Sequence, residues 1–147
     1  MILPDFKAFP RVGRIMGIDW GAARTGIAVS DPSRAFLFVR PVVNSKTDLA
    51  QRILKLASDE GVVGIVIGLP LRMDGTDSDT TARVREFAEQ LAKLTDLPIC
   101  FIDETLSSFV AQESMGRVRM RDIKEKLDSE SARVMLENAI AVIRRLG

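Results

Sequence analysis

The chain has 147 residues, 46% of them hydrophobic and 28% charged, as is typical of a globular domain that buries its own core. A net charge of +1 gives no general attraction to nucleic acid, and no apolar run approaches the roughly 20 residues of a membrane span. Because there is no histidine, a Ser-His-Asp triad, a Cys-His pair and imidazole metal ligands are excluded. Carboxylates, hydroxyls, lysine or an oxygen-bound metal remain for any chemistry.

We expect residues 1–13 to form an irregular N-terminal arm, because prolines and charged residues interrupt their apolar residues. The arm lacks the pattern of a signal peptide, so a cytoplasmic location is expected. Residues 14–20 and 25–31 predict two strands joined by a short turn, and residues 35–43 predict a third. The short connections favour an antiparallel meander.

After Thr47 the apolar residues recur at helical spacing, and Gly61 ends this first helix. Residues 62–68 are continuously apolar, which is typical of a strand buried on both faces. The remaining expected elements are a helix over roughly 79–95, a fifth strand in LPICFIDE, a shorter helix from about Thr105, and a last helix from about Asp128 to Arg145.

This order predicts an α/β fold with a mixed five-stranded sheet, as one domain over residues 14–147. Right-handed crossovers make the first, fourth and fifth strands parallel and leave the second and third antiparallel at one edge, with helices on both faces. Cys100 lies in an apolar run and is expected to be a buried core residue.

Three carboxylates are expected to converge at one edge of this sheet. Asp19 lies in an apolar strand, where an unpaired acid loses hydration without local gain. Glu104 follows the fifth strand, with Asp103 beside it, and Asp128 lies one helical turn before the buried stripe that begins at Ala132. Helix capping is the competing explanation for Asp128 and Glu104. Three acids in one cleft repel each other unless a divalent cation binds, and oxygen ligands favour Mg²⁺ or Mn²⁺.

Four segments resemble, in order, the motifs of the YqgF/RuvX family: GIDWGAARTGIAVSD, IVIGLPLRMDGT, DETLSS and KEKLDSESA. This resemblance implies a ribonuclease H-like fold and a metal-dependent nuclease related to the RuvC resolvases. It implies maturation of the precursor of 16S rRNA, with Holliday-junction resolution as the alternative. The family's acidic triad falls on Asp19, Glu104 and Asp128, which would act as catalytic residues and metal ligands in a two-metal mechanism.

Two positions depart from the family pattern. Many members have a Lys-Arg pair in the first turn, where this chain has Ala23 and Arg24, and an arginine often follows the acid at Glu104, where this chain has Thr105. If these cations hold phosphate in relatives, activity or substrate choice differs in this chain. The acidic triad itself is intact.

A basic segment just before Asp128 is a candidate for nucleic-acid contact, together with Arg24. Its candidate residues are Arg117, Arg119, Arg121, Lys124 and Lys126. The resemblance implies RNA more than DNA as the partner. Contact through the backbone and shape is expected, because aromatic residues are few.

Two other classes of protein remain as alternatives. One is a sugar-kinase or actin-type phosphotransferase, which DWGAARTG would fit but which needs a second comparable domain. The other is a catalytically silent RNA-binding or regulatory module on the same fold. The sequence leaves the choice between monomer and homodimer open.

Overall fold

The structure, a computed structural model, describes the backbone of residues 1–103 and 120–146, and side chains in residues 1–103 and 130–146. The short helix predicted from Thr105 lies outside the described residues. The elements are β1 (Ile2–Leu3), β2 (Ile15–Asp19), β3 (Arg24–Ser30), β4 (Leu37–Asn44), α1 (Leu49–Glu60), β5 (Gly64–Leu69), α2 (Asp79–Leu94), β6 (Ile99–Asp103) and α4 (Met120–Arg145). None of these helices combines the length and apolar character that a membrane crossing requires.

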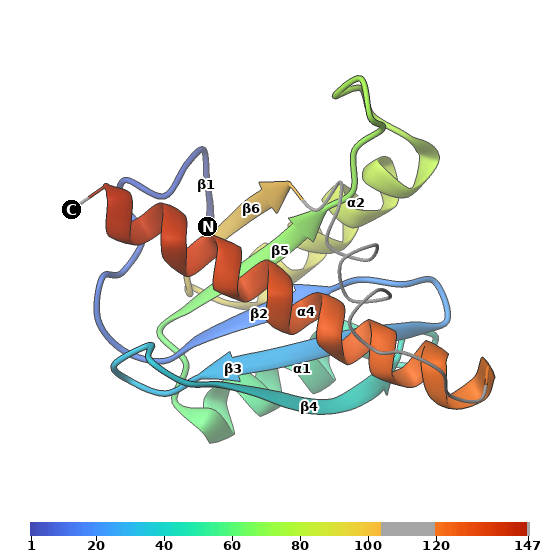
Figure 1. Cartoon of the computed structure of the whole chain (residues 1–147), viewed down its shortest axis with the longest axis horizontal. Coiled ribbons are helices and arrows are strands. Elements are labelled where there is room, and N and C mark those ends of the chain that lie inside the picture. The colour runs from blue at the N-terminus through green and yellow to red at the C-terminus, as the bar shows by residue number, and fades with distance from the viewer. Residues whose placement is uncertain (104–119, 147) are drawn as a thin grey trace.

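The strands form one mixed sheet in the order β1-β6-β5-β2-β3-β4 (Figure 1). The first long strands, β2, β3 and β4, form the predicted antiparallel meander. β2, β5 and β6 are mutually parallel, as the crossover rule predicts. The mixed α/β sheet is therefore confirmed, with one strand more than the five predicted.

The additional strand comes from the N-terminal arm. Ile2 and Leu3 pair in parallel with Ile99 and Cys100 at the edge of the sheet. The arm is otherwise irregular but packed: Phe9 is 2% exposed, and a Cβ atom on Gly64 would lie 2.7 Å from its ring. The arm thus covers part of the sheet.

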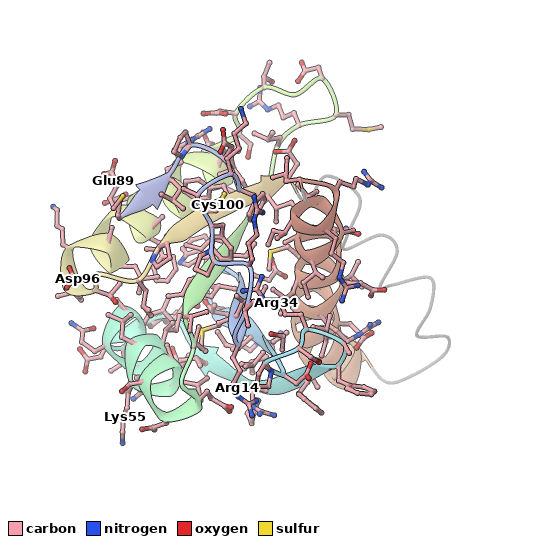
Figure 2. All side chains as sticks on the ribbon, turned by 90° about the vertical axis from the view of Figure 1, so that its left-hand side faces the viewer. Arg14, Arg34, Lys55, Glu89, Asp96 and Cys100 are labelled. Carbon is pink, nitrogen blue, oxygen red and sulfur yellow. The ribbon has the colours of Figure 1, made fainter. Side chains whose placement is uncertain are left out.

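The two faces of the sheet pack against different helices, as the views from two sides agree (Figures 1 and 2). Ile15, Val66 and Cys100 belong to the core cluster under α4. Their neighbours Met16 and Ile65 belong to the cluster shared with α1 and α2. Each strand alternates sides in this way because successive side chains of a strand point to opposite faces.

Cys100 is the buried core residue that the sequence predicts. It is 1% exposed and lies inside the molecule in Figure 2. Burial, together with the nearby charge of Asp5, raises the pKa of its thiol to about 11. A thiol that stays protonated at neutral pH is a poor nucleophile, so Cys100 has a structural role.

The last helix begins earlier than predicted. α4 starts at Met120 rather than near Asp128, so the prediction of that boundary is wrong. Its buried stripe begins at Ala132, as predicted, and continues to Ile143, whereas Leu146, the next residue at apolar spacing, is 44% exposed. The buried apolar positions are Ala132, Met135, Leu136, Ala139, Ile140 and Ile143.

Gly17 allows α4 to lie directly on β2. A Cβ atom at Gly17 would lie 3.0 Å from Leu136 Cβ and Met135 Cε, and 3.2 Å from the Ala132 carbonyl oxygen. We therefore expect Gly17→Ala to lower the free energy of unfolding by about 1–3 kcal/mol, because the helix must move away from the sheet. Chemical denaturation checks this, and an unchanged midpoint would contradict the close packing.

Arg34 is an unusual core residue in the loop between β3 and β4. Its side chain is buried, with Nε donating to the Gly13 carbonyl at 2.9 Å, while its two terminal nitrogens have no hydrogen-bond partner among the described residues. Burial and the charges of Arg11 and Arg144 lower its pKa. An unpaired buried charge of this kind destabilises the folded state.

Replacing Arg34 with a neutral chain of similar length is therefore expected to stabilise the protein. For Arg34→Met we expect the free energy of unfolding to rise by about 1 kcal/mol, and the melting temperature to rise by about 2–4 °C. Differential scanning calorimetry measures both. A lower melting temperature would mean that the bond to Gly13 outweighs the buried charge.

Candidate active site

Asp19 is the last residue of β2, at the carboxyl end of the parallel strands where α/β sheets place their sites. β2 lies in the interior of the sheet between β5 and β3. Alternation along β2 puts Asp19 on the same face as Ile15 and Gly17, which is the face covered by α4. Its side chain is half-buried.

Glycines flank Asp19 on both neighbouring strands. Gly26 lies directly opposite it on β3, at the position where the register between β3 and β4 shifts. On β5, Gly68 lies two residues after Val66, and therefore on the α4 face as well. Neither neighbouring strand therefore carries a side chain directly beside Asp19 on this face.

The other glycines of the first motif have structural explanations. Gly17 accommodates α4, as described above. A Cβ atom at Gly21 would collide with the Arg24 carbonyl oxygen, so glycine is required for the tight turn between β2 and β3. Close packing and turn geometry therefore explain both residues.

Asp128 lies inside α4, eight residues after its start, so it is not the N-cap of this helix. α4 runs back across β2, with its earlier residues nearer the carboxyl end of that strand (Figure 1). The carbonyl of Ala132 lies over Gly17. Asp128 lies one helical turn before Ala132, and Asp19 lies two residues after Gly17. Each step covers about 6–7 Å in the same direction, so the backbone positions of Asp128 and Asp19 lie on the same side of the sheet.

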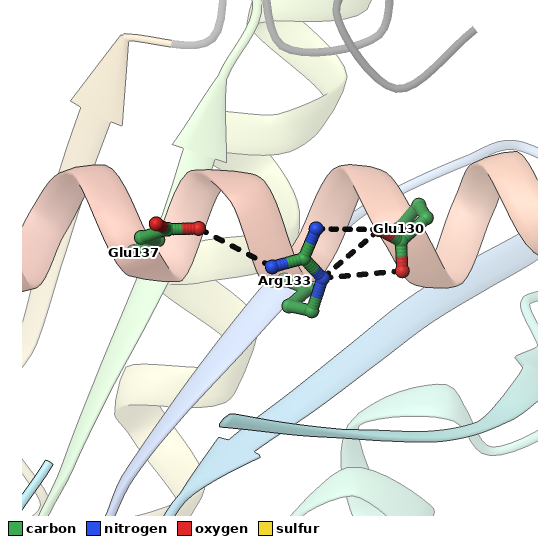
Figure 3. Close-up of polar contacts among 3 residues, drawn as sticks. All are labelled: Glu130, Arg133 and Glu137. Atoms are coloured by element: carbon green, nitrogen blue, oxygen red, sulfur yellow. Dashed lines mark hydrogen bonds and ion pairs between the residues drawn. The ribbon is translucent and has the colours of Figure 1, made fainter. Parts of the chain in front are cut away.

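Glu130 is already paired, although it is close to Asp128 in the chain. Its Oε1 lies 2.6 Å from Arg133 Nη2, and Arg133 also contacts Glu137 at 3.3 Å (Figure 3). The guanidinium of Arg133 has a raised pKa because it bonds Glu130. Glu130 is therefore a weaker candidate than Asp128 for holding a metal.

The remaining acids of the prediction lie partly outside the described residues. Glu104 is not described, nor is the side chain of Asp128, so the structure tests neither as a ligand. In the described part of the chain, no three acids gather into a metal-binding group. Asp103 is exposed and shares the face of Ile99 and Phe101, opposite to Asp19, so it does not join the predicted site.

Of the predicted nucleic-acid contacts, Arg24 is the one whose side chain is described. It begins β3, just after the turn that follows Asp19, and is half-buried. Arg117 and Arg119 lie outside the described residues. Arg121, Lys124 and Lys126 lie in the first two turns of α4, and their side chains are not described.

Trp20 is a candidate that sequence reasoning missed. It follows Asp19 and packs on the other face of the sheet, where it lines a cleft between α1 and α2. Its signal in the sequence was that the only tryptophan of the chain stands directly beside the acid in the strand.

Residues 13–141 match the family model for RuvX, described as Holliday junction resolvase. The chain belongs to the RuvX family. A protein of Maridesulfovibrio salexigens called "Putative pre-16S rRNA nuclease" is 41% identical, over 87% of this chain and 98% of its own length. A protein of Paracoccus denitrificans with the same name is 37% identical, over 96% and 92% of the two chains. These names agree with the nuclease class predicted from the sequence.

Solved structures show that the fold is shared with RuvC-type resolvases. Yeast mitochondrial Ydc2 matches 92% of this chain and 80% of its own with a TM-score of 0.58, at 13% identity. Thermus thermophilus RuvC, solved with a Holliday junction, matches 91% of this chain and 97% of its own with a TM-score of 0.55, at 11% identity. The predicted ribonuclease H-like architecture of this RuvX member is confirmed.

Proposed function

We propose that the chain is a divalent-metal-dependent nuclease that hydrolyses phosphodiester bonds, with the precursor of 16S rRNA as its natural substrate. The observation that carries this proposal is the position of Asp19, a carboxylate at the carboxyl end of a central strand, flanked by glycines. The names of the RuvX relatives support both the reaction and the substrate.

The acidic triad of the proposal is Asp19, Glu104 and Asp128. The interior position of Asp128 in α4 supports its role in the triad. Helix capping does not explain an aspartate at this position, and an aspartate inside a helix is locally unfavourable. Asp19 would hold the metal from the sheet and Asp128 from the helix above it. Their carboxylate oxygens suit Mg²⁺ or Mn²⁺, which would supply an activated water and stabilise the leaving 3′-oxygen.

The test is a cleavage assay on three substrates: a 16S-precursor fragment, single-stranded RNA of unrelated sequence and a four-way DNA junction. With Mg²⁺ or Mn²⁺ we expect the precursor fragment to be cleaved fastest. Preferential cleavage of the junction would favour a resolvase, which is the second candidate because the family description names that activity. If no substrate is cleaved, the result would favour a catalytically silent RNA-binding module over a nuclease.

The basic residues before Asp128 are expected to bind the phosphate backbone. Changing Arg117, Arg119 and Arg121 together to alanine should weaken RNA binding and lower the slope of log affinity against log salt by about 2, because each lost phosphate contact removes about 0.7–0.9. Filter binding at several salt concentrations measures both.

A control for this variant removes Arg52 and Lys55, which are exposed on α1, on the other side of the sheet. This pair should leave the salt slope nearly unchanged. If the triple variant binds like the wild type, its arginines form an ordinary solvated face.

A further inference from the structure

A cleft of about 620 Å³ opens between α1 and α2, on the face of the sheet opposite α4. Trp20 lies at this cleft and is half-buried. Asp19 and Trp20 are consecutive in the chain but lie toward opposite faces of the sheet, so the cleft is on the face opposite the candidate catalytic carboxylate. Its volume is in the range of sites for small ligands.

One stripe of α2 forms a wall of the cleft. Arg83, Phe87 and Gln90 recur at the three- and four-residue spacing that brings side chains onto one side of a helix. Phe87 is 5% exposed and forms an apolar base, whereas Gln90 is exposed and polar. The first turn of α1 contributes Gln51 across the cleft.

The charges that line the cleft balance. Arg83 and Lys93 carry positive charge, and Asp48 and Glu86 carry negative charge. A phosphate group therefore gains no net attraction there. The aromatic ring of Trp20 and the two glutamine amides, which both donate and accept hydrogen bonds, suit a flat neutral group with a polar edge.

We propose that this cleft binds one unpaired nucleobase of the substrate strand, which stacks on Trp20 and is hydrogen-bonded at its edge by Gln51 and Gln90. The proposal rests on the nuclease function proposed above and narrows its substrate class to single strands or unpaired ends and loops. A base in a duplex is stacked and paired on both sides, so it is not free to enter the cleft.

The test measures binding without cleavage, using the full chain in excess chelator. Three probes of equal length are compared: a single-stranded RNA, the same RNA with its bases removed at the central positions, and a blunt RNA duplex. We expect the single strand to quench the fluorescence of Trp20 saturably, and the abasic strand and the duplex to quench it weakly. The abasic strand keeps every phosphate, so it separates base binding from backbone binding.

Variants are compared by the anisotropy of a labelled single strand. Trp20→Ala should weaken binding by about 5- to 100-fold, the usual effect of losing one stacked base, and Trp20→Phe should retain most of it. Gln90→Ala should weaken binding several-fold. Thr80→Ala, an exposed position on α2 outside the cleft, is the matched control and should bind like the wild type.

Equal affinity for the abasic and the complete strand would overturn the proposal. Undiminished binding by Trp20→Ala and Gln90→Ala, alongside an absence of quenching in the wild type, would also overturn it. If Trp20→Ala fails to fold, the abasic comparison and Gln90→Ala still decide. Base-dependent quenching without any metal-dependent cleavage would contradict the nuclease but not the base-binding cleft. Cleavage without base dependence would contradict the cleft alone.

Discussion

Asp19→Asn is expected to abolish cleavage while leaving the metal-free protein as stable as the wild type or more stable. The change keeps the size of the side chain and removes the charge that would hold the metal. We expect a loss of about a thousandfold in rate, which corresponds to about 4 kcal/mol of transition-state stabilisation. If Glu104 and Asp128 lie beside Asp19 as proposed, removing its charge in the absence of metal relieves a repulsion, so the melting temperature should hold or rise.

Asp31→Asn is the matched control, since Asp31 is an acid with a purely structural set of bonds. It accepts hydrogen bonds from the Ser33 hydroxyl and from the Phe36 backbone at 2.9 Å, and these bonds lower its pKa to about 2. A lowered pKa stabilises the fold at neutral pH, and that contribution is lost as pH falls toward 2. This variant should therefore melt earlier at pH 7 and still cleave RNA.

The two aspartates thus differ in the sign of the stability change and in activity. Thermal melts in chelator and cleavage assays on the same preparations measure both. A marked fall in the melting temperature of metal-free Asp19→Asn, with cleavage retained, would show that Asp19 is a structural residue rather than a metal ligand.

Removal of divalent cations is the second change with a large expected effect. Cleavage should stop in excess chelator and return with Mn²⁺ or Mg²⁺. A metal at a hundred times its dissociation constant should stabilise the folded state by about 2.7 kcal/mol, which raises the melting temperature by about 5–10 °C.

Sodium chloride at the same ionic strength is the control for this measurement, and Asp19→Asn should lose most of the metal-induced shift. Full cleavage in excess chelator would exclude the carboxylate–metal mechanism. A metal shift of the same size in Asp19→Asn would locate the ion elsewhere in the protein.

Local pattern was sufficient to predict the elements that build the site. The unbroken apolar run of β5, the helical spacing in α1 and α2, and the Gly61 stop are all found as predicted, because they depend on short-range periodicity and backbone preference. Asp19 could be singled out for the same reason, since one acid in an apolar strand violates a local rule. Glu104 and Asp128 followed from the end of the fifth strand and the stripe of the last helix, and the four family motifs indicated the same acids.

Other features depend on contacts between residues far apart in the chain. Ile2 forms a strand because it pairs with Ile99, which no local pattern in the arm reveals. The start of α4 at Met120 lies in a charged segment without a clear apolar stripe, so periodicity placed the boundary too late. Leu146 fits the apolar spacing of the helix but is 44% exposed.

The sequence by itself determined the order of the strands and helices from Ile15 to Asp103, the direction in which these strands pair with one another, and the acid in the central strand, because periodicity, short turns and crossover handedness are local or general constraints. Only the tertiary structure decided that Asp128 is interior to α4, that glycines flank Asp19, and that Trp20 lines a cleft between α1 and α2. Each of these depends on how separate elements pack, and packing is set by side-chain volumes that meet only when the chain has folded.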